Sequence, residues 1–301
     1  MTNNEPTGQH DLPRTYLKRF VIDPNNRKFR SMIYCYWENQ YETKCETVSI
    51  NSKKFKNDNF YTVNHPNEPF IFETFFKDEI EPLYNKIMIE IESEQNPSFE
   101  CRNYLILWLF YNKYRNKAFR EIIENLVNFQ IETSYSMQYG KEKFKPLSEE
   151  AKSIAASKAK KLHLQFLFKE EMLLNFEKGI GTNHWIILKS KPNNQFLTND
   201  DPGFSINIEM GNIDFNSLNS SYATNYKASN FFILSPKYCL LISPFWEGTP
   251  LDISILNQHI EFKITNNSYI DFINYCTKVT RTKYLISNNK IMIDKHTKIN
   301  T

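Results

Sequence analysis

The stretch of sequence that decides the fold is Leu105-Ile106-Leu107-Trp108-Leu109-Phe110-Tyr111, in which every side chain is apolar or aromatic. A helix that is apolar on all sides is buried on all sides. The run is well short of the ~18 to 20 residues that a membrane-spanning helix needs. We therefore expect a helix at the centre of the protein's own core, and no membrane span.

Helical patterns continue on both sides of this run. A helix is predicted over residues 98–139, and a second after Pro69, where apolar residues step by three and four along one face. Ser148 followed by Glu149 and Glu150 is typical of a capped helix start and predicts a third helix that extends to about residue 176. The apolar positions of the second helix are Phe72, Phe76, Ile80, Leu83, Ile87 and Ile91.

Strands are expected toward both ends of the chain. Residues 14–22 and 28–37 are rich in β-branched and aromatic residues, and Asp23-Pro24-Asn25-Asn26 between them is typical of a turn, which predicts a hairpin. A further strand is predicted at residues 47–50. Beyond residue 181 the prediction is strands at 185–188, 195–197, 231–234 and 239–243, then a final helix at 268–287 and a short tail strand.

These elements indicate an α+β fold. We expect an N-terminal β-hairpin, a central helical region, C-terminal antiparallel strands that close a shared sheet with the hairpin, and a final helix. No internal repeat and no Gly- or Ser-rich linker divides the sequence. The prediction is one large domain over residues 1–301, with a strand-rich sub-lobe (1–68 plus 182–301) and a helical one (69–181).

Composition limits the class of protein. Hydrophobic residues make up 41% and aromatic residues 15% of the 301 residues, which is enough for an independent core. The net charge of +3 neither demands nor excludes a nucleic-acid partner. Five scattered cysteines without a Cys-x-x-Cys pair predict buried free thiols. The polar residues 1–9 do not form a signal peptide, so a cytoplasmic location is expected; the sequence does not fix the oligomeric state.

Three motifs appear in a recognisable order: His10-Asp11-Leu12-Pro13-Arg14-Thr15-Tyr16-Leu17-Lys18-Arg19-Phe20, then Phe196-Leu197-Thr198-Asn199-Asp200-Asp201-Pro202, then Ile233-Leu234-Ser235-Pro236. Together they resemble the domain-of-unknown-function family numbered 4238, whose members open with His-x-x-Pro-x-x-Tyr-Leu-x-x-Phe and later carry a Phe-x-Thr-Ser-Asp-x-Pro turn. The resemblance covers nearly the whole chain. Asn199 stands where that family usually has serine, and Asn116 follows Arg115 where threonine-proline is common. The resemblance supplies positions and no reaction.

Acidic and imidazole groups are the candidates for acid–base or metal chemistry. Asp200 and Asp201 lie where a strand enters a turn and could converge on a divalent cation, Mg²⁺ or Mn²⁺, with Glu73 as a further ligand. The alternative is an Asx-turn at Asp200, with Glu73 in an ion-pair ladder on its helix. His10, held by the following Pro13, suits a general base or metal ligand; the alternative is a hairpin cap.

Cations and aromatic residues gather at the end of the central helix, where phosphate contact and base stacking could be combined. Arg115 is the predicted catalytic clamp on phosphate, because its planar fork bonds in two places; the alternative is an internal salt bridge to a helix acid. His163 is either a second catalytic imidazole or a satisfied core histidine. The expected substrate-binding residues are Arg14, Lys113, Tyr114 and Arg120.

Two hypotheses follow from these residues. The first is a nuclease-like enzyme or toxin-type effector, of the kind used in bacterial defence, that binds nucleic acid along residues 113–120 and along the lysines of residues 152–161. The second is a non-catalytic module that binds a small ligand or a partner protein. In the enzyme, the imidazole, guanidinium and carboxylates should meet in one cleft. In the module they should be dispersed and individually paired.

Overall fold

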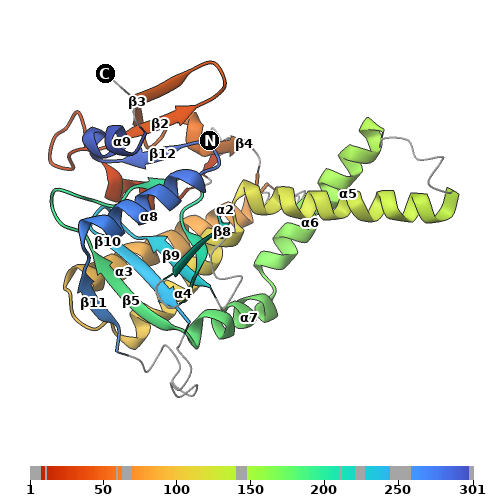
Figure 1. Cartoon of the computed structure of the whole chain (residues 1–301). Helices are drawn as coiled ribbons and strands as arrows, with labels where there is room; N and C mark the ends of the chain where they lie inside the picture. Colours follow the sequence, from red (N-terminus) through yellow and green to blue (C-terminus); the bar gives the residue numbers. More distant parts are fainter. Residues whose placement is uncertain are drawn as a thin grey trace, which may run out of the picture.

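The computed structural model describes residues 8–10, 12–58, 60–62, 70–139, 148–209, 212–220, 228–244 and 259–297. The fold is α+β, as predicted (Figure 1). The helices are α1 Arg14–Leu17, α2 Ile71–Phe75, the π-helical turn η3 Phe76–Ile80, α3 Glu81–Glu92, α4 Phe99–Tyr114, α5 Lys117–Tyr139, α6 Glu149–Leu167, α7 Glu170–Gly181, α8 Asn267–Val279 and α9 Lys290–Thr297, with 3₁₀ turns at Lys18–Phe20 and Lys53–Phe55. Among these described helices, none combines the length and apolar character that crossing a bilayer requires.

The strands form three sheets in the described part of the chain. The largest has the order β11-β5-β10-β9-β7-β8, with only β11 and β5 parallel. A second sheet has the order β3-β2-β12-β6, and β1 pairs with β4. The strands are β1 Gly8–His10, β2 Met32–Glu38, β3 Thr43–Ser49, β4 Lys56–Asp58, β5 His184–Lys189, β6 Thr198–Asn199, β7 Phe204–Glu209, β8 Asn212–Asn219, β9 Ser229–Ile233, β10 Tyr238–Ser243, β11 Glu261–Ile264 and β12 Leu285–Ser287.

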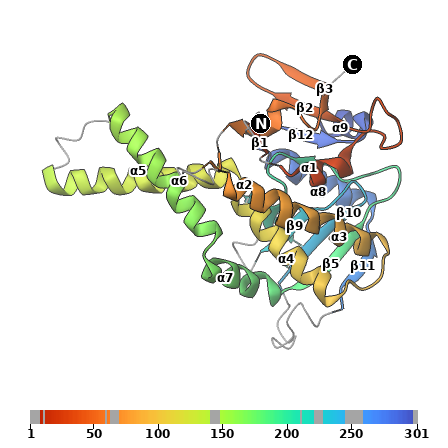
Figure 2. The same cartoon turned by 180° about the vertical axis from the view of Figure 1, so that it is seen from behind.

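Helices cover both faces of the large sheet (Figures 1 and 2). The neighbouring residues Phe231 and Phe232 point to opposite faces of β9. The Phe232 ring lies 5.3 Å from Trp108 of α4, whereas the Phe231 ring lies 6.2 Å from Phe272 of α8. Tyr84 of α3 stacks on Trp108 at 4.4 Å. The all-apolar run in α4 is therefore buried between α3 and the sheet, as predicted.

Tyr16 of α1 connects the two larger sheets. Its hydroxyl donates to the backbone carbonyl of Ile233 in β9 at 2.8 Å and lies 2.5 Å from the Thr198 hydroxyl in β6. Because Tyr16 is fully buried, both contacts are made without competition from water. The opening motif thus fixes the small sheet against the large one, and with it the β6 turn that carries Asp200.

Several helices and strands have bounds in the structure that differ from those predicted from the sequence. The N-terminal hairpin is confirmed, but its strands are β2 and β3; residues 14–20 are helical, so the strand predicted at 14–22 is wrong. A helix explains the apolar residues of this segment. Tyr16 and Phe20 lie one helical turn apart, and their ring centroids are 5.2 Å apart. The final helix ends at Val279, and the predicted tail strand is the helix α9. The helices at 98–139 and 148–176 are confirmed but divided, at residues 115–116 and 168–169.

The predicted closure of a shared sheet is confirmed for β12 and β6. Leu285 of β12 pairs with Tyr36 of the hairpin on one side and with Asn199 on the other. The strands predicted near 185–188, 231–234 and 239–243 instead belong to the large sheet, which has its own helical covers. The five cysteines are free, and all but the half-buried Cys45 are buried, as expected.

Candidate functional site

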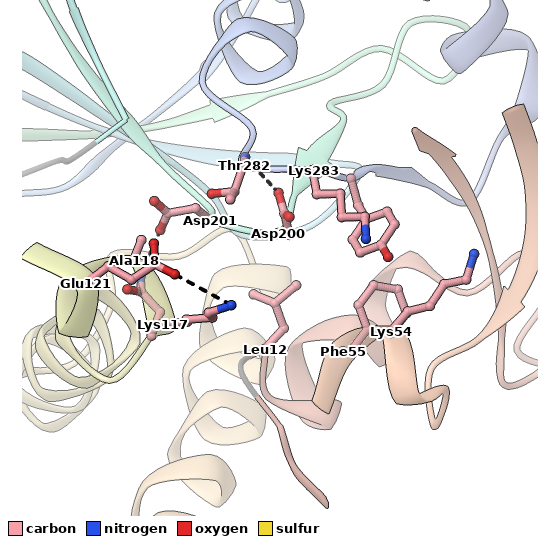
Figure 3. A pocket seen from close by; sticks show the side chains of 12 residues that line it. Leu12, Lys54, Phe55, Lys117, Ala118, Glu121, Asp200, Asp201, Thr282 and Lys283 are labelled. Atoms are coloured by element: carbon pink, nitrogen blue, oxygen red, sulfur yellow. Dashed lines mark hydrogen bonds and ion pairs between the residues drawn. The ribbon is translucent and has the colours of Figure 1, made fainter. Parts of the chain in front are cut away.

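A pocket of about 240 Å³ opens where five parts of the chain, distant in sequence, meet. The start of α5 forms one wall, the turn after β6 a second, and the residues before β12 a third (Figure 3). Acids lie within the pocket and lysines around it. The lining residues are Leu12, Lys54, Phe55, Asn116, Lys117, Ala118, Glu121, Asp200, Asp201, Thr282, Lys283 and Tyr284.

Asp200 is held by backbone donors. Its Oδ1 accepts the N–H of Thr282 at 3.0 Å, and its own N–H donates to the carbonyl of Tyr284 at 3.2 Å. Burial raises the pKa of the carboxyl group, while the backbone N–H groups of residues 282–284 act in the opposite direction by stabilising the carboxylate. One Asp200 oxygen is thus used to attach the turn after β6 to the segment that leads into β12.

Asp201 is held by a side chain. Asn116 donates its Nδ2–H to Asp201 Oδ1 at 2.9 Å and accepts the N–H of Phe119 on its own Oδ1 at 2.8 Å, so the amide orientation is fixed by both partners. Burial, assisted by the charge of Asp200, raises the pKa of Asp201 to about 7. Asp201 can therefore accept or release a proton near neutral pH.

Lys113 lies behind Asp201, away from the larger pocket. It lines a second cavity of about 60 Å³ together with Asn116 and Asp201. Burial lowers the pKa of Lys113 to about 7, and the Asp201 charge opposes that change. An acid and an amine whose pKa values converge near 7 are thus neighbours in a region that excludes most water.

Lysines surround the pocket without closing it (Figure 3). Lys117 pairs with Glu121 at 3.5 Å, and Lys54 pairs with Glu46 of the hairpin. Lys283 Nζ lies 5.1 Å from the centre of the Tyr284 ring. The lining also carries Glu121, Asp200 and Asp201, so acids balance the lysines. In the described part of the chain Lys283 is in no ion pair, and its ammonium group is therefore the one most available to an anionic ligand.

Arg115 forms a second polar cluster on the other side of the α4–α5 junction. Its guanidinium is 2% exposed, donates to Glu81 at 3.2 Å and lies 5.1 Å from the Phe76 ring of η3. Its carbonyl accepts the hydroxyl of Tyr61. The alternative of an internal salt bridge to a helix acid is what the structure shows. Nε of Arg115 is buried and has no hydrogen-bond partner in the part of the chain that the structure describes.

His10 and Glu73 lie within electrostatic reach of Arg115. Burial lowers the pKa of His10 to about 4, and the charges of Lys56, Arg14 and Arg115 act in the same direction. Burial raises the pKa of Glu73, whereas Arg115 opposes that rise. Nδ1 of His10 is buried, and none of the described residues forms a hydrogen bond with it. His10, Glu73 and Arg115 are thus brought together, next to the pocket of Asp200 and Asp201 but not in it.

His163 lies in the core with both ring nitrogens engaged. Its Nε2–H donates to the carbonyl of Tyr114 at 2.6 Å, and its Nδ1 accepts from Nε of Arg120 at 3.0 Å. Arg120 also stacks over the Phe60 ring at 3.5 Å. This arrangement corresponds to the satisfied core histidine, and it uses Tyr114 and Arg120 for packing. Arg14 lies exposed on α1.

The expected cation ligands do not gather around one point. In the described ranges, no three side chains of Asp, Glu, His or Cys are placed as ligands of one metal ion. Asp200 is bonded to backbone N–H groups, Asp201 to Asn116, and Glu73 lies with Arg115 instead. This donor set does not fit a divalent cation held by all three residues.

The sequence did not single out every residue of the pocket. Lys54 comes from the 3₁₀ turn Lys53–Phe55 and Lys283 from the segment before β12, and nothing in their local patterns indicates that they share a pocket. Asn116 was noted only as a departure from a motif, although an asparagine three residues before a helical N–H is a recognised capping signal. Its second contact, to Asp201, depends on folding.

The family model of proteins of unknown function DUF4238 matches residues 8–290. The chain belongs to this family. No curated protein and no solved structure is significantly similar to it. The DUF4238 match includes the opening motif, the α4–α5 junction and the turn after β6, so both polar clusters lie within the family region.

Proposed function

We propose that this protein is a nuclease-like enzyme that cleaves phosphodiester bonds at the pocket of Asp201. One observation carries the proposal: a carboxylate with a pKa near 7 lies in a pocket surrounded by lysines. A general base works best when its pKa is close to the operating pH. A polyanionic strand is the ligand that a lysine-lined mouth favours.

In this mechanism Asp201 takes the proton of the attacking hydroxyl or water. The oxygen so released forms the new P–O bond while the bond to the leaving oxygen breaks, and solvent supplies the proton for that oxygen. Lys117 and Lys283 attract the phosphate and offset its charge. Asn116 orients the carboxylate, and Lys113 tunes its pKa from behind.

The clusters predicted to bind nucleic acid contribute unequally to this proposal. Lys113 and Arg115 are buried, and Arg120 packs on Phe60, so residues 113–120 present chiefly Lys117 to solvent. Lys158 and Lys161 are exposed on α6. The pocket lysines are therefore the main support for an anionic substrate.

The test is incubation of purified protein with end-labelled RNA, tRNA and single-stranded DNA, with Mn²⁺, with Mg²⁺ and with EDTA. Asp201→Asn should abolish cleavage, whereas Asp214→Asn, at an exposed acid on β8, should not. Persistence of cleavage in EDTA supports acid–base chemistry by Asp201 without a cation, and dependence on Mn²⁺ restores the cation hypothesis. Full activity of Asp201→Asn contradicts the proposed base. His10→Ala tests whether the Arg115 cluster takes part.

A second candidate, a ligand-binding module, is favoured by a different observation. Arg115, His163 and Asp200 are each individually paired, as expected if polar residues hold loops in place. Here the same pocket would bind an anionic small molecule without altering it. Saturable binding of a mononucleotide, with no cleavage of any nucleic acid, would distinguish this function.

A further inference from the structure

Helices α5 and α6 extend away from the body of the molecule as an arm (Figures 1 and 2). The two helices cross, and at the crossing a small separate core forms from Val127 of α5 with Ala155 and Ala159 of α6. The alanines allow close approach, but they bury little apolar area. The apolar core between the two helices is therefore small, and many side chains of the arm are exposed to solvent.

The outer face of α5 is apolar. Ile122, Leu126, Phe129 and Met137 are 54%, 58%, 65% and 82% exposed. Spacings of four, three and eight residues place these side chains on one side of the helix. Single exposed apolar residues are ordinary, but a continuous stripe of them marks an interaction surface.

The exposed face of α6 lies on the same side of the arm as the apolar stripe of α5. An open hollow of about 600 Å³ is lined by Phe129 and Tyr135 of α5 together with Lys158 of α6. Ile154, at 61% exposed, lies one helical turn before Lys158. The two crossing helices thus present one combined surface, which is apolar along α5 and partly basic along α6.

Charge indicates what covers this surface. From Glu121 onward α5 carries acids and no lysine or arginine, whereas α6 carries three lysines after its first turn, at positions 158, 160 and 161. Within the described ranges, Glu132 and Lys158 are in no ion pair. Glu132 lies one turn from Phe129 at the edge of the stripe, and Lys158 lies one turn from Ile154, so a stripe laid over α6 of a second copy brings opposite charges together. The arm surface is thus complementary to itself, which is the requirement for a two-fold symmetric contact.

The arm surface is also large enough for a contact between two copies of the chain. A helix of the length of α5 spans about 35 Å at 1.5 Å per residue. The 19 residues of α6 add about 28 Å, so with a contact width of about 10 Å per helix the two helices offer at most roughly 630 Å² per copy, at the lower limit of the about 600 to 1,000 Å² per partner of a standard interface. We propose that the arm is a self-association surface, on which the α5 stripe of one copy packs over α6 of a second copy.

The test is the mass of the full-length protein in solution by light scattering and sedimentation between 1 and 100 µM, concentrations of the order at which such contacts form. The expected result is a dimer that Phe129→Glu weakens at least tenfold. Ile291→Glu, at an apolar residue of α9 that is 74% exposed, is the matched control and should leave the dimer intact. Because Phe129 is exposed, circular dichroism should show normal folding of the variant.

A mixing experiment identifies the contacts. Glu132→Lys, one turn from Phe129, and Lys158→Glu with Lys161→Glu, should each weaken the dimer, and mixing the two variants should restore it. A wild-type monomer at all concentrations overturns the proposal, as does a dimer that Phe129→Glu does not weaken. Binding of the monomer to anionic vesicles, or to RNA through α6, would assign the surface to a different occupant and also overturn it.

Discussion

Asn116 connects the arm to the pocket: its amide nitrogen donates to Asp201 at 2.9 Å, while its amide oxygen caps α5 by accepting the N–H of Phe119 at 2.8 Å. One side chain therefore fixes the start of α5 and the orientation of the pocket acid. An aspartate at this position could still cap the helix but would repel Asp201. A serine could cap but would not reach as far.

This dual role predicts different effects for the two substitutions. Asn116→Ser should lower the free energy of unfolding by about 1 kcal/mol, the cost of a lost hydrogen bond. Asn116→Asp should also raise the pKa of Asp201, because a second carboxylate opposes its ionisation. Urea unfolding and the pH–rate profile measure these effects, with the exposed Asn125→Ser as control. An unchanged profile in Asn116→Asp would show that the contact does not influence Asp201.

The pKa of Asp201 predicts how stability depends on pH. The folded value, about 7, lies above the ordinary value of 3.8, so between these two values the native state binds more protons than the unfolded state. Stability conferred by this group is therefore present at low pH and lost as pH rises from about 4 to 7. Replacing Asp201 by asparagine removes that loss.

The measurement is the free energy of unfolding of Asp201→Asn and wild type at pH 5 and pH 8. The free energy of unfolding of the variant relative to wild type should be higher at pH 8 than at pH 5. The difference should be on the order of 1 kcal/mol, since a full pKa unit corresponds to 1.36 kcal/mol. Lys113→Met should behave in the opposite way, with its advantage larger at pH 6 than at pH 9, because burial lowers the pKa of that amine. Parallel curves for wild type and both variants would contradict the assigned environments.

Much of the fold follows from local sequence patterns. The α4 helix is predictable because seven successive apolar side chains are consistent only with burial on all sides, and Ser148 marks the start of α6 by capping Ala151 at 3.2 Å. Residues 14–20 are helical although their aromatic and β-branched content predicts a strand, because such content indicates burial as well as strand. The i, i+4 pair of Tyr16 and Phe20 is the helical signal that composition obscures.

The candidate site can be predicted only partly from the sequence. Asp200 and Asp201 could be selected because they are acids at the end of a strand, and Arg115 because it ends a buried helix. Which residue bonds to which depends on long-range packing: the turn belongs to Asn199, whose Oδ1 accepts the N–H of Asp201 at 3.0 Å, and not to Asp200. Lys54 reaches the pocket from a part of the chain distant in sequence, so no spacing rule could reveal it.

Asp200 is predicted to be a structural residue. Asp200→Ala removes the acceptor for the N–H of Thr282 and should cost about 1 to 3 kcal/mol of unfolding free energy with no added cation. Asp200→Asn, which keeps one acceptor oxygen, should cost less. Thermal unfolding in EDTA and in Mn²⁺ checks this. Normal melting of the alanine variant in EDTA, combined with loss of a Mn²⁺-dependent increase in wild-type stability, would instead assign Asp200 to cation binding.

His163 predicts sensitivity to acid. Burial lowers its pKa to about 4, below the ordinary 6.5, so the native state binds fewer protons than the unfolded state between these values. The stability associated with the neutral ring is present above pH 6.5 and lost as pH falls toward 4.

A glutamine in place of His163 cannot engage both Tyr114 and Arg120 as the ring does, so His163→Gln should lose about 2 kcal/mol at pH 7. Its stability should fall less than that of wild type between pH 7 and 5. Urea unfolding at both pH values is the measurement, with His184→Gln, a partly exposed histidine of β5, as the control. Equal acid sensitivity in wild type and His163→Gln would show that His163 is not the group that limits stability in acid, and would leave His10, whose pKa is also lowered to about 4, as the next residue to substitute.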